Sequence, residues 1–343
     1  MKSHGKKVAI ALSGGIDSLV AGYLLKKDYP DLFGICFTTG YEKRKPDLSP
    51  IARKLDIAIH HVDLSETFNN RVVKYFIGTY MKGRTPNPCI ECNKAIKFRA
   101  LLHAAQSFGA DTIATGHYAV IREQNSTYTL LKGKDHLKDQ SYFLSKLSTR
   151  DLKNIIFPLG NKTKEEVKNY ARKKGLIPVE KKESQDICFL KNQTIPDFIL
   201  SKTNEKSRPG TIINHENRVI GTHQGLLNFT IGQRRGINCP ASEPYYVKKI
   251  DCENNTLIVC FKDQLFNRSF SVNLLHLLMD NINSPLRVNT KIRYNHRGAA
   301  SVLTLRGTDH ADIEFDKEQF AITPGQTAVF YLDNRVIGSG TII

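Results

Sequence analysis

The stretch KVAIALSGGIDS, residues 7–18, decides the fold of the N-terminal half of the chain. Its apolar part, Lys7–Leu12, predicts a short strand, and Leu19–Lys27 follows with helical spacing. Between the two, Gly14 and Gly15 let the backbone turn tightly and direct its N–H groups inward, where the start of the helix adds positive potential. An ordinary Gly-Gly turn is the alternative, but the Asp-Ser pair at 17 and 18 favours a phosphate-binding loop. No Gly-Lys-Ser/Thr follows, so the loop is not of the Walker type.

The alternation of strands and helices continues to about residue 195. A capping box, Thr163–Glu166, opens one of the helices, and Gly175 ends it. Strands separated by helices predict a parallel sheet covered on both faces, which is the α/β class. The other expected elements are strands at Leu32–Thr38, Ile57–Val62 and Asp111–Thr115 and helices at Leu48–Leu55 and Ile96–Phe108.

The pattern changes after Pro196. Residues 205–265 hold short β-like pieces among glycines and prolines, and alternating runs from Phe270 to Ile343 predict a small antiparallel β-barrel. We therefore expect an α/β domain with the phosphate loop over 1–195, a small central domain over 196–268 and a C-terminal barrel over 269–343. The expected barrel strands are Val288–Arg293, Ala300–Arg306, Ala328–Leu332 and Val336–Ile343.

The chain carries 50 Lys+Arg against 33 Asp+Glu, a formal net charge of +17 over 343 residues. A basic but inert surface is one explanation. A polyanionic partner is the commoner cause of such an excess, so we expect a nucleic acid, although charge does not separate RNA from DNA. No apolar run has the length of a membrane span, and the N-terminal residues leave no room for a signal peptide. No membrane partner and a cytoplasmic location are therefore expected.

Seven cysteines, an odd number, argue against a disulfide framework. Two of them, Cys89 and Cys92, follow two prolines that predict an extended loop. Asn93 would cap the next helix and place Cys92 at its positive end beside Lys94 and Lys97, surroundings that lower the pKa of a thiol. A zinc half-site or an inert pair are the alternatives. Zinc needs four ligands and no second CxxC exists, so no metal site is expected.

Three further stretches are less specific when taken singly. Cys188 precedes a phenylalanine, an arrangement that is more common in cores than in active sites. Thr115–Tyr118 follows the C-terminal end of a strand, where open α/β sheets bind ligands. Lys138–Ser141 could face a nucleotide or merely solvent.

Taken together, these motifs resemble one family. The ordered set is SGGIDS, TPNPCIECNKAIKF, ATGHYA, KDQSYFL, ESQDICF, NFTIGQRRG and TPGQ. The first is similar to the PP-loop of N-type ATP pyrophosphatases, which adenylate a substrate and release pyrophosphate. The whole set resembles the bacterial tRNA-specific 2-thiouridylase family, often called MnmA. The resemblance implies a PP-loop domain, a central domain and a β-barrel, and an enzyme that replaces O2 of the wobble uridine of tRNA, position 34, with sulfur.

The resemblance also implies roles for individual residues. Cys188 carries the incoming persulfide sulfur, Cys92 is the nucleophile that resolves the sulfur intermediate, and a disulfide bond belongs to the same chemistry. Asp17 helps to hold Mg²⁺. ATP is bound by Ala11, Leu12, Ser13, Gly14, Gly15, Ile16, Asp17 and Ser18, with Phe37 and Gly116 around the adenosine. The flipped base is bordered by Asn87, Pro88 and Cys89, and tRNA is contacted by His117, Lys138, Asp139, Gln140, Arg293, Tyr294 and Gln326.

The expected cofactors are ATP and Mg²⁺. The expected partners are the tRNAs for Lys, Glu and Gln, with a cysteine desulfurase or a relay protein as sulfur donor. Some family members carry Asp where this chain has Cys89, which leaves the general base open. Cys89, Cys92 and Cys188 could instead hold an iron–sulfur cluster with one open iron. The persulfide is favoured, because CxxC alone does not establish a cluster.

Two other functions fit parts of the pattern. A PP-loop enzyme that adenylates a small molecule, such as an amidotransferase-type synthetase, would give Cys92 and Cys188 no role and would need no barrel. A tRNA-binding module without catalysis would not need the intact Ser13–Ser18 loop. Thiolation of uridine needs a phosphate loop, two reachable thiols and a basic surface, and the sequence provides all three. An ATP-dependent tRNA-uridine 2-sulfurtransferase is therefore the expected enzyme.

Overall fold

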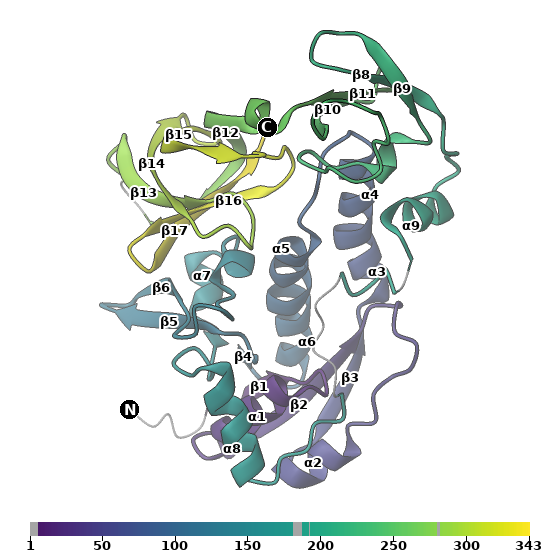
Figure 1. Cartoon of the computed structure of the whole chain (residues 1–343). Helices are drawn as coiled ribbons and strands as arrows, with labels where there is room; N and C mark the ends of the chain where they lie inside the picture. The colour runs from purple at the N-terminus through teal and green to yellow at the C-terminus, as the bar shows by residue number, and fades with distance from the viewer. Residues whose placement is uncertain (1–5, 181–186, 192, 280–281) are drawn as a thin grey trace. The chain divides into compact units, whose positions relative to one another are not determined.

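The computed structural model describes residues 6–180, 187–191, 193–279 and 282–343 (Figure 1). These residues form two compact units, each of which is described by itself. The first unit comprises the described residues of Met1–Val72, Cys89–Phe189 and Asn334–Ile337, and the second those of Val73–Pro88, Leu190–Asp333 and Gly338–Ile343. The division into three domains at 195/196 and 268/269 stays a prediction. Among the described residues, no helix is both long and apolar enough to cross a bilayer.

A five-stranded parallel sheet in the order β3-β2-β1-β4-β7 forms the centre of the first unit. β1 pairs with β2 from Val8 opposite Leu32, and β2 continues with β3 from Gly34 opposite Ile59. The predicted parallel sheet is confirmed. The strands are β1 (Val8–Ala11), β2 (Leu32–Thr38), β3 (Ile59–Asp63), β4 (Thr112–Ala114) and β7 (Ile155–Ile156).

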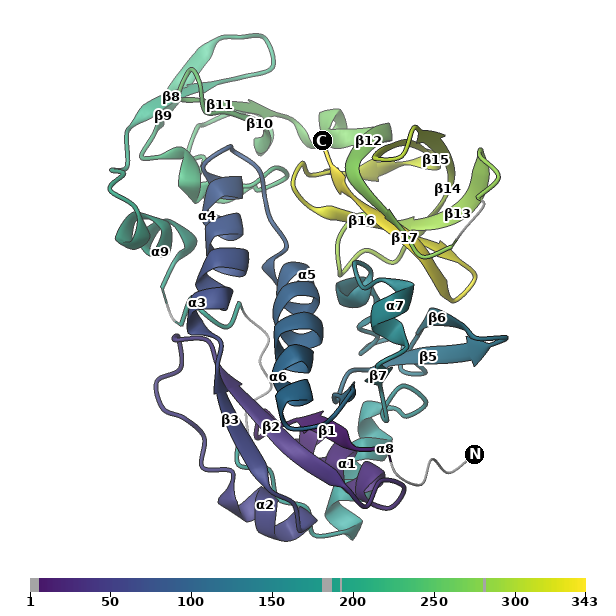
Figure 2. The ribbon, with the colours of Figure 1, turned by 180° about the vertical axis from the view of Figure 1, so that it is seen from behind.

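Helices cover both faces of this sheet, because successive side chains of each strand point to opposite sides. On one face, apolar residues of α1 (Ile16–Lys26), α2 (Ser49–Leu55) and α8 (Lys164–Lys173) form one core cluster with the strands. On the other, Phe108 at the end of α6 (Leu101–Ser107) packs on Phe33 and His60. Figures 1 and 2 show the unit from these two sides.

An antiparallel hairpin, β5 (Ala119–Gln124) and β6 (Thr127–Lys132), also belongs to the first unit and was not expected from the sequence. Its two turn residues, Asn125 and Ser126, have φ values of 49° and 59°. Positive φ at both positions is typical of a type I′ turn, whose twist matches that of paired strands. The unit also contains α3 (Ser65–Phe68), α7 (Thr149–Leu152), the 3-10 helix η3 (Ser141–Leu144), the π-helix η2 (Asn93–Ala100) and, from Cys89 onward, α5 (Pro88–Cys92).

The second unit contains a four-stranded sheet and a barrel. The sheet has the order β10-β11-β8-β9 and encloses a small core around Ile212, Val247 and Leu257. The barrel has the order β12-β15-β14-β13-β16-β17 and closes through β12 against β17, as predicted.

The sheet strands are β8 (Gly210–Ile213), β9 (Val219–His223), β10 (Tyr246–Asp251) and β11 (Thr256–Cys260). Those of the barrel are β12 (Phe266–Leu277), β13 (Leu286–Lys291), β14 (Ala299–Arg306), β15 (His310–Phe320), β16 (Thr327–Leu332) and β17 (Arg335–Ile342). The helices are α4 (Lys74–Tyr80) and α9 (Ile195–Lys202), with 3-10 turns η4 (Leu226–Asn228) and η5 (Lys262–Leu265), and the π-turn η1 (Asn69–Val73) precedes α4.

Candidate active site

The loop between β1 and α1 has the geometry of an anion-binding turn. Gly14 has a φ of +84°, and a Cβ at this position would meet Glu180 Cγ at 3.2 Å, so glycine is required. The Ser18 hydroxyl accepts from Ser13 N at 3.3 Å and donates to Gly15 O at 3.0 Å, which closes the loop on itself. Within the described chain no side chain caps Gly15, the N-cap of α1. The first N–H groups of α1 are therefore left for a ligand, as phosphate-binding helices require.

Gly116, after β4, lies directly against this loop. A Cβ at Gly116 would lie 2.9 Å from the carbonyl carbon of Asp17 and 3.0 Å from Ser18 N. Both atoms belong to the backbone and cannot rotate away. The close approach explains why glycine stands here and places Gly116 beside the loop, while Phe37 lies half-buried in β2.

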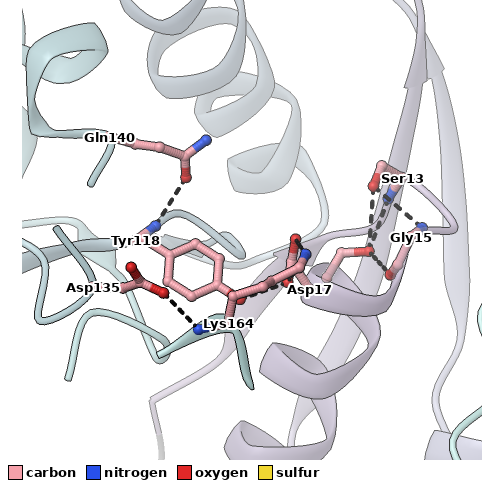
Figure 3. Close-up of polar contacts among 8 residues, drawn as sticks. Ser13, Gly15, Asp17, Tyr118, Asp135, Gln140 and Lys164 are labelled. Carbon is pink, nitrogen blue, oxygen red and sulfur yellow. Dashed lines mark hydrogen bonds and ion pairs between the residues drawn. The ribbon is translucent and has the colours of Figure 1, made fainter. Parts of the chain in front are cut away.

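The carboxylate of Asp17 is held by two side chains that the sequence analysis did not single out (Figure 3). Lys164 Nζ donates to Asp17 Oδ1 at 2.9 Å and to Oδ2 at 2.7 Å, and the Tyr118 hydroxyl donates to Oδ1 at 2.7 Å. Lys164 is buried at the start of α8, where its backbone N–H donates to Asp135 Oδ2 at 2.8 Å. A lysine therefore contacts the carboxylate that, by the family resemblance, helps to hold Mg²⁺.

The Lys138–Ser141 stretch supports this arrangement. Gln140 Oε1 accepts from Tyr118 N, and Gln140 N donates to Tyr118 O, both at 2.9 Å. The buried Asp139 carboxylate accepts from Gly133 N at 2.9 Å, from Ser141 N at 3.1 Å and from Ser141 Oγ at 2.8 Å. Gln140 and Asp139 thus fix the backbone around Tyr118. Their contact with tRNA, like that of the half-buried Lys138, stays a prediction.

Cys89 and Cys92 lie in the first turn of a helix that begins at Pro88. The prediction that Asn93 caps this helix is wrong, because Asn93 is buried inside it and donates from Nδ2 to Phe143 O at 3.1 Å. Proline at the first position has a suitable φ and needs no acceptor for an N–H, so the helix can start one turn earlier. All seven cysteines are unpaired in this structure.

The three thiols named from the sequence come together in the first unit. Burial raises the pKa of Cys92 to about 12; Lys97 opposes this rise, and Cys188 and Cys89 add to it. Burial likewise raises the pKa of Cys89 and of Cys188. The prediction of a lowered pKa at Cys92 is therefore wrong, because the loss of hydration at a half-buried thiol outweighs the nearby cation.

Lys94 is not among the charged groups that shift the pKa values of the three thiols. The charged groups around its ammonium are Glu91, Lys146, Arg99 and Asp151, and burial lowers its pKa. Lys146 and Glu91 themselves form an ion pair at 2.7 Å. Within the described residues, no group of three or more His, Cys, Asp or Glu side chains is arranged to hold a metal ion.

His117 is a buried, neutral neighbour of the thiol helix. Its ring packs against Phe98 and Phe157, and its Nδ1 lies 2.7 Å from Thr115 Oγ1. Burial, and then the charge of Lys97, lower the pKa of His117 well below 6.5. A contact with tRNA by His117 stays a prediction, and it would be made by a neutral ring.

The remaining tRNA-contacting candidates lie in the second unit. Gln326 Nε2 donates to Thr85 O and to Pro86 O, both at 3.2 Å, and so fastens the loop that carries Asn87 and Pro88 to the barrel. Arg293 Nη1 donates to Phe320 O at 3.1 Å. Tyr294 lies under Lys291 Nζ, 5.6 Å from the ring centre. Glu183, Ser184, Gln185 and Asp186 of the ESQDICF motif lie outside the described residues.

Sequence reasoning missed Lys164 and Tyr118 as members of the site. Lys164 was visible only as part of a capping box, which the structure confirms through Thr163 and Glu166. The residues around Lys164 do not indicate that its side chain contacts Asp17, which lies 147 positions earlier in the sequence. Tyr118 stands next to Gly116-His117, and that proximity was the one available signal.

Family models and curated relatives match this chain along almost its whole length. Three family models match consecutive parts: a tRNA methyl transferase HUP domain over residues 6–192, a tRNA methyl transferase PRC-barrel domain over 196–261 and an aminomethyltransferase beta-barrel domain over 267–342. The protein from Desulfosudis oleivorans named tRNA-specific 2-thiouridylase MnmA is 43% identical over 344 residues, covering 100% of this chain and 96% of its own length. The chain belongs to the tRNA-specific 2-thiouridylase family.

Other members of this family give the same picture. Proteins of the same name from Desulfotalea psychrophila and Clostridium perfringens are 40% and 36% identical, covering 97% and 98% of this chain and 98% of each relative. The solved U34-tRNA thiolase NcsA from Methanococcus maripaludis with its 4Fe-4S cluster aligns with a TM-score of 0.34 at 20% identity, covering 59% of this chain and 65% of that chain. The structural similarity to this thiolase is too low to support a conclusion about the reaction.

Proposed function

We propose that the chain is a tRNA 2-thiouridine synthase, which replaces O2 of the wobble uridine with sulfur at the expense of ATP. The observation that carries the proposal is the presence, in one compact unit, of an uncapped phosphate-type loop and three thiols that influence one another. A small-molecule adenylating enzyme would need the loop but not the thiols. The name of the relatives and the net charge of +17 support tRNA as the polyanionic substrate.

The Ser13–Ser18 loop suits the phosphates of a nucleoside triphosphate, because it offers backbone N–H donors at the start of α1. Phe37 and Gly116 are proposed at the adenosine side. Binding of Mg²⁺ stays a prediction, because both carboxylate oxygens of Asp17 accept from Lys164. No step of the reaction below depends on the metal.

In the first step the loop holds the phosphates while uridine O2 attacks the α-phosphorus of ATP. A bond forms between O2 and the α-phosphorus, and pyrophosphate leaves with the electrons of the broken phosphoanhydride bond. Oxide is a poor leaving group from carbon 2, whereas AMP is a good one. Adenylation therefore prepares carbon 2 for attack by sulfur.

In the second step Cys188 carries the incoming sulfur as a persulfide. The terminal sulfur, as an anion, attacks carbon 2; a C–S bond forms, and AMP leaves with the electrons of the C–O bond. Cys92 thiolate then attacks the Cys188 sulfur and forms a disulfide with it, and the electrons of the broken S–S bond stay on the 2-thiouridine. A thiol reductant restores Cys92 and Cys188 for the next turnover.

An iron–sulfur cluster on Cys89, Cys92 and Cys188 is the alternative chemistry. The persulfide is favoured because a CxxC pair alone does not establish a cluster. Under the persulfide mechanism Cys89→Asp keeps substantial activity, as Cys89 borders the base pocket. Under the cluster mechanism the same variant loses its iron and its turnover together, which anaerobic purification with iron analysis would detect.

The deciding experiment incubates the full-length protein with ATP, Mg²⁺, unmodified tRNA and a persulfide-generating cysteine desulfurase. Mass spectrometry of the digested tRNA should detect 2-thiouridine, with AMP and pyrophosphate as the other products. The Lys, Glu and Gln tRNAs are the predicted substrates. Cys92→Ser should load sulfur and then stall, whereas Cys188→Ser should not load it. Formation of ADP and phosphate in stoichiometric amounts would refute the PP-loop assignment.

A further inference from the structure

The helix that carries Cys89 and Cys92 changes its winding immediately after Cys92. From Asn93 to Ala100 it is a π-helix of eight residues, and the N–H of Leu101 still donates to the carbonyl of Ile96, five residues earlier. In an α-helix, residues five apart point about 140° away from each other. In a π-helix they lie one turn apart on the same side. The altered winding therefore turns Lys97 toward the face that carries Cys92.

Cys188 reaches the same region through its neighbour Phe189. The Phe189 ring packs on Phe68 and Tyr41, with ring centres 5.8 Å and 5.9 Å apart. Phe68 ends α3, which packs against the π-helix η2. Two segments far apart in sequence thus bring a third thiol to the helix face that carries Lys97.

Lys97 is half-buried, and no carboxylate in the described part of the chain lies within ion-pair distance of its ammonium. Lys94, one turn earlier, differs because Glu91 and Asp151 lie near it. The charge of Lys97 acts on the three thiols, where it favours the anionic form of each. The groups that face Lys97 are Cys89, Cys92, Cys188 and the neutral His117, with Glu42 facing Cys188 from another segment.

Partial burial, which is greater at Cys92 than at the exposed Cys89 and Cys188, makes the cation important. It raises the pKa of each of the three, that of Cys92 to about 12, and among the groups acting on Cys92 only Lys97 opposes the rise. His117 offers no charge because its own pKa is lowered well below 6.5. Without Lys97, the Cys92 thiolate would be a charge in a poorly hydrated place, and a persulfide anion on the exposed Cys188 would lose its nearby cation.

We propose that Lys97, turned toward the thiols by the π-helix, supplies the positive charge that stabilises the sulfur anions at Cys92 and Cys188. The inference rests on the proposed function for its role in sulfur transfer. Lys97 holds the charge of the terminal persulfide sulfur before it attacks carbon 2. It then holds the charge of the Cys92 thiolate before the disulfide forms. Each sulfur anion loses its negative charge when it forms a bond. The same Lys97 ammonium can therefore stabilise first the persulfide and then the Cys92 thiolate.

Alkylation of the thiols tests this role without tRNA or ATP. Full-length protein is treated with iodoacetamide at several pH values from about pH 7 to about pH 10, and the rates at which the Cys92 and Cys188 peptides are modified are measured by mass spectrometry. Lys97→Met should slow the alkylation of Cys92 and Cys188 about tenfold or more at each pH, because below its pKa a thiol reacts in proportion to its thiolate fraction, and removing a nearby cation lowers that fraction. Lys97→Arg should stay close to the wild type. Lys94→Met, which removes the same charge from the same helix, is the matched control and should also react like the wild type.

A second measurement separates this role from general damage to the site. In a single turnover with persulfide-loaded protein, Lys97→Met should slow the formation of 2-thiouridine and the release of AMP about tenfold or more, while pyrophosphate from the adenylation step appears at the wild-type rate. If Lys97→Met fails to fold, as judged by thermal unfolding, Lys97→Gln and Lys97→Arg are compared instead, with loss expected only for Gln. Unchanged alkylation in a folded Met or Gln variant would overturn the proposal. If wild-type protein makes no 2-thiouridine, the proposed function fails, but the alkylation result still decides the role of Lys97.

Discussion

Asp17 and Lys164 form an ion pair between residues 147 positions apart, with 32% and 9% of their side-chain surfaces exposed. Loss of one partner leaves the other charge poorly hydrated and without its counter-ion, whereas loss of both removes the problem. Tyr118 adds a third contact to Asp17 and is itself held by Gln140. This small network sets the carboxylate beside the phosphate loop, so its energetics can be measured apart from catalysis.

The first prediction concerns the stability of this pair. Asp17→Asn and Lys164→Met should each destabilise the protein by about 1–3 kcal/mol, because each leaves a partly buried charge unpaired. The double variant should lose about 1 kcal/mol less than the sum of the two. Urea unfolding of the four proteins measures this coupling. Strictly additive losses would contradict an energetic link between the two side chains.

The second prediction concerns His117 and pH. Its folded-state pKa lies below 6.5, so below about pH 6.5 the unfolded chain binds a proton that the folded protein does not. The free energy of unfolding should therefore fall as pH drops from about 7 toward the folded pKa, and His117→Asn should make that fall shallower. Urea unfolding at about pH 5 and pH 7 tests this, with the exposed His136→Gln as control. An unchanged slope in His117→Asn would count against the buried neutral ring.

At the scale of elements, the site is built where segments approach backbone to backbone. Gly116, after β4, touches the backbone of the loop that opens α1. The side-chain amide of Gln326, just before β16, donates hydrogen bonds to the backbone carbonyls of Thr85 and Pro86. The winding of the thiol helix changes at Asn93. These contacts depend on where whole strands and helices end rather than on single side chains.

The third prediction belongs to this scale. Gly116→Ala should reduce ATP-dependent AMP formation by about tenfold or more, because its Cβ would lie 2.9 Å from the Asp17 backbone and must displace the phosphate loop. Gly78→Ala in α4 is the control, since a Cβ there meets nothing within 4 Å. That change should be neutral or stabilise by up to about 1 kcal/mol. Equal effects of the two substitutions on AMP formation would refute the steric explanation.

At the scale of the whole molecule, the net charge of +17 comes from basic residues in both units rather than from one cluster. Arg234 and Arg235 are exposed neighbours in the second unit, on the segment NFTIGQRRG. Contacts of such side chains with phosphates release counter-ions and make affinity fall with salt. The charge therefore has a thermodynamic signature that does not require the contacts to be identified.

The fourth prediction uses that signature. The affinity for tRNA should fall steeply as salt rises, and Arg234→Ala with Arg235→Ala should weaken binding and flatten the log–log slope by about one to two. Filter binding at several salt concentrations measures both quantities. Lys173→Ala with Lys174→Ala, an exposed pair in and just after α8, removes the same charge and should change the slope less. An affinity that does not depend on salt would refute the electrostatic account.

Some elements were predictable because their signals are local. The β1–loop–α1 segment, β2, α2 and the capping box of α8 all follow from patterns within a few residues. The β5–β6 hairpin was missed because Asn125-Ser126 is a weaker turn signal than Asn-Gly. β12 and β15 were missed because polar residues alternate through them, as on the outer face of a barrel.

The sequence by itself determined the fold class, the phosphate-type loop, the barrel and the set of cysteines, since each depends on residue order over short distances. Only the tertiary structure decided that Asp17 meets Lys164, that Asn93 lies inside its helix, and that the Cys92 thiol has a raised pKa. These outcomes depend on burial and on contacts between distant segments. Local patterns carry no record of either, because the water excluded from a thiol or a carboxylate is set by everything that packs around it.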